Sequence, residues 1–356
     1  MAAGRSKNIY YRVPEILYEA WRVYGDAREI TSIVEVSALV STNQVFRLSL
    51  GDGTNVIAKV SSYGSYFQFR EDHQRVHQWF QLLQDGPYDG FLSDSLLKND
   101  DVYTYYDGAV WVIFYNDISI RSYLPRILSE QQIVELGRQM ARFHSTCAEV
   151  AKRLPPSAKS IKSDIIFLFD LLSDRHHARK FRMRTWQMDL LRYHCHTFLE
   201  NLERLGYENW TKIPVLIDWN LGNFSVEFGE RESFRLFSRW DYDWFRIDPS
   251  GLDFYFLSRV CSSVGDRTVF SYLVDPLLEP RFQLFVRAYH ALRPLQREDL
   301  LFFKEAYRFF ILNYVIKDGD HFFQPEIISR LKQEALDRYL PEIDQVDFGP
   351  LLRSLD

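Results

Sequence analysis

The sequence has few of the features that mark secreted, metal-binding or membrane proteins. Its 356 residues include three cysteines, Cys147, Cys195 and Cys261, which lie far apart and form no CxxC pair. This pattern suggests neither a disulfide framework nor a zinc site, and it favours a reducing compartment. No run of eighteen apolar residues occurs, and the first fifteen residues lack an apolar core of signal-peptide length. We therefore expect a cytoplasmic protein with no membrane association.

The chain also lacks a strong charge of either sign. Its formal net charge is -5, with 26% charged, 46% hydrophobic and 16% aromatic residues. Such a composition indicates a globular chain without a basic field for nucleic acid. One local exception is the basic stretch of residues 175–184, for which a solvated surface and a rim attracting an anionic substrate both remain open. The length favours two lobes, and the oligomeric state is left undetermined.

Glycine is missing from residues 33–50, so the protein-kinase type of phosphate-binding loop, G-x-G-x-x-G, is absent. Apolar alternation nevertheless predicts an antiparallel sheet in this part of the chain. After a short leading helix at 14–24, we expect strands at 33–37, 44–50, 55–60, 102–106 and 109–115, with a helix at 67–83 before the last two.

The remainder is mainly helical by its apolar periodicity. We expect helices at 129–149, 165–173, 185–205, 254–264, 276–292, 297–315 and 325–339. His144, on the apolar face of the first, is expected to be a core histidine rather than a ligand. The fold class is therefore α+β and bilobal, with a small antiparallel sheet and one helix in residues 1–116 and a larger, mainly helical lobe in residues 117–356.

Lys59 is the single charge on the otherwise apolar strand N-V-I-A-K-V. A lysine at a sheet edge and a point charge presented to phosphates remain open as explanations. Glu71 stands early in the following helix, where we expect it to face Lys59 and hold its ammonium group.

Three oxygen-bearing side chains meet in residues 214–253. Alternating residues at 224–228 and 234–240 flank a turn cluster at 229–232, which predicts a β-hairpin. A hairpin returns Asp241 to the neighbourhood of Asp218 and Asn223, which precede it. Each residue alone is more often a turn former or cap. Together they are the hard oxygen ligands that hold Mg²⁺ on a polyphosphate.

These parts match what phosphoryl transfer from ATP requires, which is mainly positioning and neutralisation of charge. Lys59 would contact the phosphates, while Asn223 and Asp241 would bind Mg²⁺. Asp218 would accept or orient the proton of the attacking hydroxyl. A loop at 38–43 would cover the phosphates through Ser41, Thr42 and Asn43.

Three motifs resemble those of the aminoglycoside phosphotransferase and choline kinase-like family, relatives of the protein kinases. The catalytic loop H-G-D-x-x-x-x-N is matched by Leu216, Ile217, Asp218 and Asn223. The metal motif is matched by residues 240–243, then by Asp-Pro at 248–249 and by residues 253–254. The helix motif L-G-x-x-L-A-x-L-H is similar to residues 136–144. These matches span roughly residues 33–260.

The resemblance implies a protein kinase-like fold that binds ATP and Mg²⁺. It implies Asp218 as the catalytic aspartate, Asn223 and Asp241 as magnesium ligands, and Lys59 as the lysine on the nucleotide phosphates. Tyr115 and Asn116 fall where the family offers backbone hydrogen bonds to adenine.

The sequence departs from the family at Leu216 and Ile217, which replace His-Gly. Two hypotheses therefore stand: an ATP- and Mg²⁺-dependent kinase, and a pseudokinase or nucleotide-binding module without phosphotransfer. The short connection between Asp241 and Asp253 favours a small hydroxylated acceptor, aminoglycoside-, choline- or sugar-like, over a peptide. Acidic and aromatic side chains could line such a site, although each is more often a surface or core residue. They are Asp243, Asp248, Asp318, Asp320, Trp240, Trp244 and Tyr255.

Overall fold

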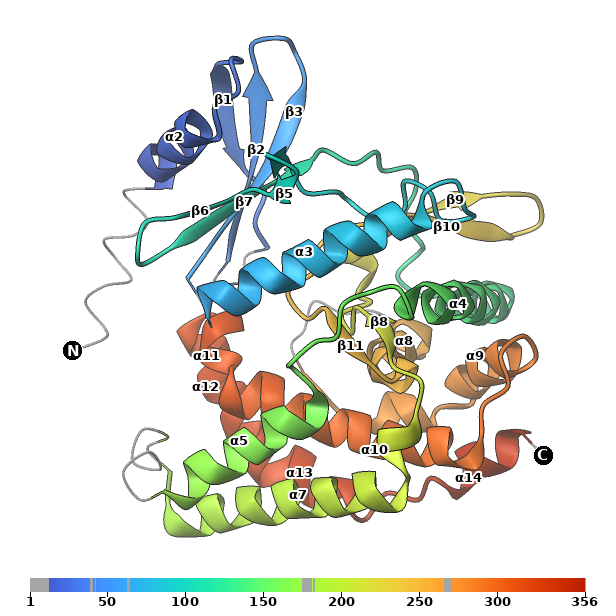
Figure 1. The fold of residues 1–356 in the computed structure, drawn as a ribbon. Helices are drawn as coiled ribbons and strands as arrows, with labels where there is room; N and C mark the ends of the chain where they lie inside the picture. The colour runs from blue at the N-terminus through green and yellow to red at the C-terminus, as the bar shows by residue number, and fades with distance from the viewer. Residues whose placement is uncertain are drawn as a thin grey trace.

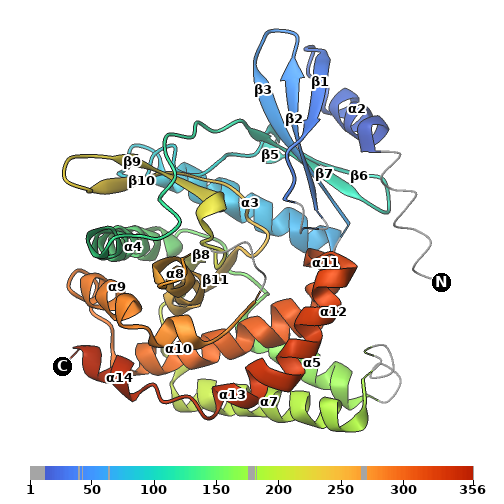
Figure 2. The same ribbon diagram turned by 180° about the vertical axis from the view of Figure 1, so that it is seen from behind.

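The computed structural model describes residues 13–38, 41, 43–62, 65–174, 181, 183–265 and 271–355. Thr42 and most of the basic stretch at 175–184 lie outside them, so the predictions made for these residues stay as predictions. Figures 1 and 2 show a bilobal α+β molecule, with a twisted sheet above and a larger group of helices below. The predicted fold class is confirmed.

The upper lobe is built on the predicted five-stranded antiparallel sheet. Its strand order is β1-β2-β3-β7-β6, and each neighbouring pair is antiparallel. The strands are β1 (Ile30–Glu35), β2 (Gln44–Leu50), β3 (Asn55–Ser61), β6 (Thr104–Tyr106) and β7 (Trp111–Asn116). Residue 102, expected in the last hairpin, belongs instead to a separate short pair, β4 (Leu97–Lys98) and β5 (Asp101–Val102).

Two helices cover opposite faces of this sheet. Val56, Ala58 and Val60 of β3 are buried in one cluster with residues of α2 (Val13–Tyr24). Because side chains alternate along a strand, Ile57 and Lys59 face the other side. That side is turned toward α3 (Tyr66–Leu83) and the lower lobe, as Figure 1 shows. The alternation thus directs Lys59 into the space between the lobes.

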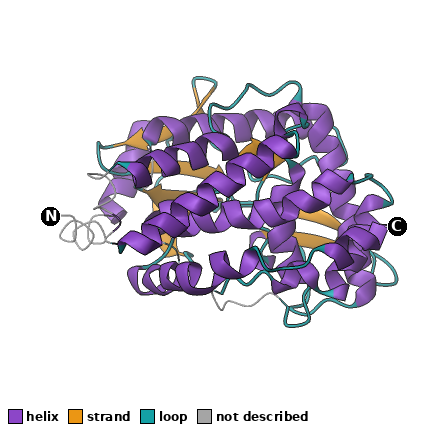
Figure 3. Ribbon diagram, turned by 90° about the horizontal axis from the view of Figure 1, so that it is seen from below, coloured by secondary structure: helices purple, strands orange, loops and turns teal. Residues whose placement is uncertain are grey.

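The lower lobe is mainly helical, and Figure 3 shows helices covering its underside. The longer helices lie where the sequence predicted them, although the one expected at 297–315 changes from α-helix to π-helix after residue 310. The α-helices are α4 (Glu130–Ala151), α5 (Ile161–Ser173), α7 (Thr185–Arg204), α8 (Phe254–Cys261), α9 (Pro280–His290), α10 (Arg297–Phe310), α11 (Gly319–Phe322), α12 (Pro325–Glu334), α13 (Leu340–Ile343) and α14 (Gly349–Leu352). The π-helical segments are η6 (Ile311–Lys317) and η7 (Ala335–Tyr339), and the 3₁₀ turns are η2 (Tyr207–Asn209), η3 (Leu221–Asn223), η4 (Ser250–Asp253), η5 (Asp275–Leu278) and η8 (Arg353–Leu355). None of the described helices is both long and apolar enough to cross a membrane.

Helix α4 carries the L-G-R-Q-M-A-R-F-H motif and packs closely against α9. A Cβ atom on Gly137 would lie 2.5 Å from the backbone oxygen of Phe285 and 3.0 Å from the Cβ atom of Ala288. Only glycine permits this approach without displacing α9. The same helix begins with a capping box in which Ser129 and Gln132 exchange hydrogen bonds.

Two short antiparallel pairs frame the segment that the sequence singled out. The predicted hairpin is confirmed as β9 (Phe224–Phe228) and β10 (Phe234–Arg239). A second pair, β8 (Ile213–Val215) with β11 (Arg246–Asp248), was not expected. The two pairs fix both ends of the loops at residues 216–223 and 240–245, so these loops lie side by side.

Candidate active site

The loop at residues 216–223 begins with a strained backbone conformation. Ile217 has a φ of 62°, in the left-handed region that β-branched residues rarely adopt. The buried carboxylate of Asp253 accepts hydrogen bonds from the backbone N–H groups of Leu216 (3.1 Å) and Ile217 (2.6 Å). Hydrogen bonds to a carboxylate are stronger than neutral ones, so they offset the strain at the position where the resemblance expects glycine.

Asp253 is itself held by His144. The Nε2 atom of His144 lies 2.9 Å from the Asp253 carboxylate, and Nδ1 lies 2.9 Å from the hydroxyl of Tyr289. Burial lowers the pKa of His144 below its ordinary value, against the attraction of Asp253. A neutral His144 then donates from Nε2 to Asp253 and accepts from Tyr289. The prediction that His144 is a satisfied core histidine is confirmed.

The hairpin returns the chain to this loop as predicted. The backbone N–H of Trp240 donates to the carbonyl of Asn223 over 3.1 Å, so Asp241 follows directly beside Asn223. The side-chain amide of Asn223 donates to the backbone carbonyl of Asp218 over 3.3 Å. The Asp218 carboxylate accepts hydrogen bonds from the side chain of Asn220 and from its backbone N–H (3.3 Å). These hydrogen bonds, together with the chain connection from Trp240 to Asp241, hold Asp218, Asn223 and Asp241 in one unit.

Lys59 reaches this unit from the sheet. Its side chain is only 6% exposed, and its ammonium pairs with the carboxylates of Asp241 (3.1 Å) and Asp243. Burial alone would lower the pKa of Lys59, but the charges of Asp241 and Asp243 outweigh burial and raise it. Burial alone would raise the pKa of Asp241, but the charges of Lys59 and Arg239 outweigh burial and lower it. The site therefore holds a charged lysine against an ionised aspartate.

Asp243 links Lys59 to the connection between β1 and β2. Asn43 donates its side-chain amide to Asp243 over 2.6 Å and accepts a hydrogen bond of 2.6 Å from Ser61. Burial raises the pKa of Asp243, and the negative charge of Asp241 raises it further. The positive charge of Lys59 lowers this pKa but does not outweigh them. Asn43 thus enters the site, whereas Ser41 bonds through its carbonyl to the side chain of Gln324 in the lower lobe (2.9 Å).

The expected pair between Lys59 and Glu71 is not formed, which corrects the sequence prediction. Glu71 pairs with Arg75 on its own helix at 3.1 Å, and its side chain is 58% exposed. The reason is helical phase. Phe69 and His73 are buried on the inner face of α3, and residue 71 lies two positions, or about 200°, from each of them.

His73 takes the inward position on α3. Its Nδ1 lies 2.8 Å from the carbonyl of Phe69, and its Nε2 lies 2.5 Å from the hydroxyl of Tyr115. Since a carbonyl only accepts, Nδ1 carries the proton and Nε2 accepts from Tyr115. Burial lowers the pKa of His73 to about 4. The helix therefore presents a neutral ring near Lys59 instead of a carboxylate.

A pocket of about 390 Å³ lies between the sheet and the lower lobe, and it contains Lys59, Asn223 and Asp241 in its wall. Apolar residues of β2, β3 and the connection after β1 contribute to its wall: Val36, Ala38, Val45 and Ile57. Trp240 and Tyr242 contribute from the lower lobe. Aliphatic and aromatic walls with a few charges at one end are typical of ligand pockets.

The segment after β7 lines the same pocket, but not through both residues that the sequence predicted. Tyr115, Asp117 and Ile118 contribute to the wall. Asn116 is not among the residues of this wall. Its backbone N–H donates to the carbonyl of Asp94 and its carbonyl accepts from the hydroxyl of Ser93, both at 2.9 Å, so both backbone groups are already engaged. The wall at this end of the pocket is therefore formed by Tyr115 and residues 117–118.

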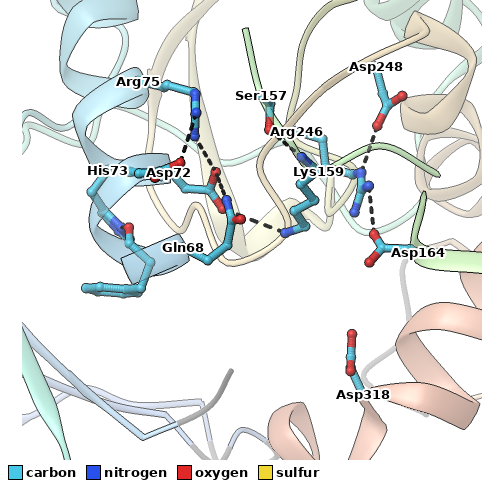
Figure 4. Close-up of polar contacts among 12 residues, drawn as sticks. Gln68, Asp72, His73, Arg75, Ser157, Lys159, Asp164, Arg246, Asp248 and Asp318 are labelled. Atoms are coloured by element: carbon cyan, nitrogen blue, oxygen red, sulfur yellow. Dashed lines mark hydrogen bonds and ion pairs between the residues drawn. The ribbon is translucent and has the colours of Figure 1, made fainter. Parts of the chain in front are cut away.

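A second polar cluster lies beside α3 and joins it to the lower lobe, as Figure 4 shows. Arg75 donates to the carbonyl of Pro156 (3.0 Å), and Lys159 pairs with Asp72 at 3.7 Å. The same view shows Asp164 paired with Arg246, at 2.8 Å. Asp164 also pairs with Lys317 at 2.7 Å. This cluster fixes α3 against the connection between α4 and α5.

The acids considered for a substrate wall are mostly engaged in such pairs. Asp248 is fully buried and accepts from Tyr207 (2.7 Å), while it pairs with Arg246 at 2.9 Å. Asp318 pairs with Lys317 at 3.3 Å, and Asp320 pairs with Lys332 at 2.7 Å. Asp248 is therefore a structural residue. Trp244 and Tyr255 are also buried in the core.

Sequence reasoning missed the roles of three residues: Arg239, Asp243 and Asp253. Asp253 occurs in a matched motif, but nothing in its spacing shows that it binds the backbone at 216–217. Arg239 and Asp243 flank Asp241 in sequence, and their alternation with Trp240 and Tyr242 is the signal that could have marked them.

No known protein-family model matches the sequence, and no curated protein matches it. Solved structures do match the fold. An amicoumacin kinase in complex with AMP-PNP, Ca²⁺ and Ami is 15% identical, with 98% of this chain and 99% of that chain covered and a TM-score of 0.65. A wild-type aminoglycoside 2'-phosphotransferase-IIIa in complex with GDP is 14% identical over 92% and 98%, with a TM-score of 0.54. A Plasmodium vivax ethanolamine kinase is 12% identical over 88% and 82%, with a TM-score of 0.55. The chain therefore has the fold that aminoglycoside phosphotransferases share with kinases of small amino alcohols.

Proposed function

We propose that this chain is an ATP- and Mg²⁺-dependent phosphotransferase that moves the γ-phosphate of ATP to a hydroxyl group of a small molecule. One observation carries the proposal. Lys59 from the sheet and Asn223 and Asp241 from the lower lobe line a single pocket, and Asp218 stands on the same loop as Asn223. The solved structures with a similar fold include nucleotide complexes of small-molecule kinases, which supports the same proposed function.

The apolar part of the pocket is suited to a nucleotide base. Val45 and Ile57 offer aliphatic contacts from the sheet and Val36 offers one from just after β1, and residues 117–118 line the same pocket. A volume of about 390 Å³ lies within the range of small-molecule sites. The boundary between the two lobes then falls after Asn116, at the end of β7, and a cytoplasmic location stays a prediction from the sequence.

The oxygen donors present fit a magnesium ion. In the described residues no group of three or more His, Cys, Asp or Glu side chains is arranged to hold a metal. Asp241 supplies one carboxylate, and Asn223 supplies an amide oxygen because its amide nitrogen is engaged with Asp218. Mg²⁺ commonly takes one or two carboxylates and completes its shell with phosphate oxygens and water. When bound, the ion would neutralise charge on the phosphates.

The residues of the chain then have distinct tasks. Lys59 binds phosphate oxygens in exchange for one of its two carboxylate partners. Asp218 orients the acceptor hydroxyl and receives its proton, a task that requires geometry before basicity. Asp253 keeps Asp218 in place by fixing the backbone of the two preceding residues.

A small acceptor is favoured over a protein. The chain between Asp241 and Asp253 is short and is occupied by β11 and η4, so it has no room for a long activation segment of the protein-kinase type. The solved structures with a similar fold are named as kinases of amicoumacin and ethanolamine and as an aminoglycoside phosphotransferase. We therefore propose a hydroxylated amine or a related sugar-like molecule as the class of acceptor.

Two measurements test this proposal. Thermal unfolding with ATP, in the presence of Mg²⁺ and of EDTA, reports nucleotide binding and its metal dependence. Transfer of labelled γ-phosphate to a panel of amino alcohols, aminoglycosides and sugars then reports the reaction. Mg²⁺-dependent binding without transfer to any acceptor of the panel would favour a nucleotide-binding module instead.

A further inference from the structure

Arg239 is a buried cation whose guanidinium contacts the loop of residues 218–223 from behind. It is the last residue of β10 and is 0% exposed. Its Nη2 donates to the backbone carbonyl of Asp218 over 2.9 Å, and its Nη1 donates to the carbonyl of Asn223 over 2.9 Å. One planar group therefore binds both ends of the loop that carries the proposed proton acceptor and a proposed metal ligand.

The backbone of Arg239 is fixed as firmly as its side chain. Its N–H donates to the carbonyl of Phe91 over 2.6 Å, and its carbonyl accepts from the backbone N–H of Ser93 (3.1 Å) and the hydroxyl of Tyr242 (3.0 Å). The guanidinium also lies over the ring of Trp219, 5.7 Å from its centroid. The side chain thus has a single orientation from which to hold the loop.

A structural role alone does not explain a charge at this place. Burial lowers the pKa of Arg239 against the charges of Asp241 and Asp218, and its Nε atom has no partner among the described residues. A buried charge that lacks full compensation destabilises a fold, and an apolar side chain of like volume avoids that cost. What arginine adds is a rigid fork with two charge-assisted hydrogen bonds, which an apolar residue cannot supply.

The two carbonyl groups are well placed for a positioning role. The Asp218 carbonyl also accepts from the amide of Asn223 at 3.3 Å, and the Asn223 carbonyl also accepts from the N–H of Trp240 at 3.1 Å. Holding both carbonyls fixes the separation of Asp218 and Asn223, and it fixes their place relative to Asp241, two residues after Arg239. A shift of about 1 Å in such an arrangement can reduce a reaction rate by about 10²-fold.

We infer that Arg239 is a positioning residue that clamps the Asp218–Asn223 loop by its two ends and sets the geometry for metal binding and proton transfer. The inference rests on the proposed function, but the clamp itself is a property of the loop. It does not require Arg239 to touch nucleotide, metal or acceptor.

The experiment compares Arg239→Met, which removes both hydrogen bonds, with Arg239→Lys, whose ammonium can still donate to carbonyl oxygens. Arg308→Met is the matched control, because Arg308 is equally buried but pairs with Glu305 and Asp344 away from the site. Hydrogen exchange of residues 216–224 measures the loop directly. ATP binding with Mg²⁺ and with EDTA, and steady-state kcat and KM, measure the consequence.

For Arg239→Met we expect faster exchange in residues 216–224, ATP binding in EDTA within about twofold of wild type, and loss of the additional affinity that Mg²⁺ provides. We expect kcat to fall by about 10²-fold with little change in the KM of the acceptor. The kcat of Arg239→Lys should be at least about tenfold higher than that of Arg239→Met. Arg308→Met should lower the melting temperature without changing the loop exchange or the effect of Mg²⁺.

The inference is overturned if hydrogen exchange of residues 216–224 is the same in Arg239→Met as in wild type. It is also overturned if Arg239→Met and Arg308→Met show the same changes in loop exchange, ATP binding and kcat. If Arg239→Met does not fold, Arg239→Lys and Arg239→Gln are compared by the same measurements. The clamp would be contradicted if these two variants had the same hydrogen exchange in the loop and the same kcat. Failure of the wild type to bind nucleotide contradicts the proposed function, whereas hydrogen exchange still decides whether Arg239 holds the loop.

Discussion

The carboxylate of Asp253 accepts a 2.6 Å hydrogen bond from the backbone N–H of Ile217, the residue directly before Asp218. This bond accounts for the departure that stands out in the sequence, a bulky residue where the family motif has glycine. Ile217 adopts a φ of 62° that glycine would reach without strain. Its buried side chain and the hydrogen bond to Asp253 together stabilise the conformation, so the loss of His-Gly does not prevent the loop from forming.

The strain at Ile217 predicts an unusual order of stability for two truncations. Both Ile217→Ala and Ile217→Gly lose the buried side chain, but glycine also relieves the strain at positive φ. We expect Ile217→Gly to be more stable than Ile217→Ala by about 1 kcal/mol in denaturant unfolding.

Ile213 on β8 is the control for that comparison, because it is equally buried in ordinary extended backbone. There alanine should be the more stable replacement by about 0.5–1 kcal/mol. The same order at both positions would mean that the backbone at Ile217 is not strained.

Asp218→Asn tests the assignment of the proton acceptor. The variant keeps the shape of the side chain but cannot accept a proton, so kcat should fall by about 10²–10⁴-fold. ATP affinity should stay within about threefold of wild type, since Lys59 and Asp241 are untouched. A wild-type kcat in this variant would remove Asp218 from its role.

Lys59→Met and Glu71→Gln separate the two residues that the sequence had paired. Loss of a charge-assisted hydrogen bond to phosphate should weaken ATP binding by about tenfold or more in Lys59→Met, as titration calorimetry would measure. Glu71→Gln should bind ATP as wild type does, because Glu71 pairs with Arg75. If Glu71→Gln reproduced a substantial part of the Lys59 defect, the pairing seen in the structure would not be the functional one.

Stability should depend on pH through buried histidines, of which His73 and His194 have the clearest shifts. Burial lowers the pKa of His73 and that of His194 to about 4. Lys59 further lowers the pKa of His73, while Asp241 raises it. Between the unfolded pKa of about 6.5 and pH 4 the unfolded chain binds more protons, so stability falls as pH falls, by up to about 3 kcal/mol per histidine.

His73→Gln removes one of these titrations. Its free energy of unfolding should therefore decrease less than that of wild type between pH 7 and pH 4.5, whatever its stability at pH 7. Parallel curves for variant and wild type would show that His73 is not buried in its neutral form.

Much of the fold follows from local sequence patterns. Strands β2 and β3 were predicted because their alternation is clear and a Gly-Asp-Gly-Thr turn joins them. The hairpin β9–β10 was predicted for the same reason, and it was enough to bring Asp241 to Asn223. Local periodicity determines such elements and the contacts that they close.

The contacts that complete the site depend on packing between distant segments. Lys59 and Asp243 are 184 residues apart, so no local pattern connects them. Glu71 was predicted to face Lys59 from its position early in α3 alone. Which face of α3 points inward is instead shown by the burial of His73, and Glu71 lies on the opposite face. Arg239 resembles an exposed residue of a hairpin in sequence, but distant segments cover it. Residues 91–93 pair with its backbone, and the loop at 218–223 binds its guanidinium.

The central claim is that Lys59, Asn223 and Asp241 form a metal-dependent nucleotide site, and titration calorimetry of ATP tests it most directly. We predict that wild-type protein binds ATP with at least about tenfold higher affinity in Mg²⁺ than in EDTA, and that Asp241→Asn loses this difference while retaining the binding measured in EDTA. Absence of ATP binding to the wild type, or an equal effect of Mg²⁺ on wild type and Asp241→Asn, would contradict the account.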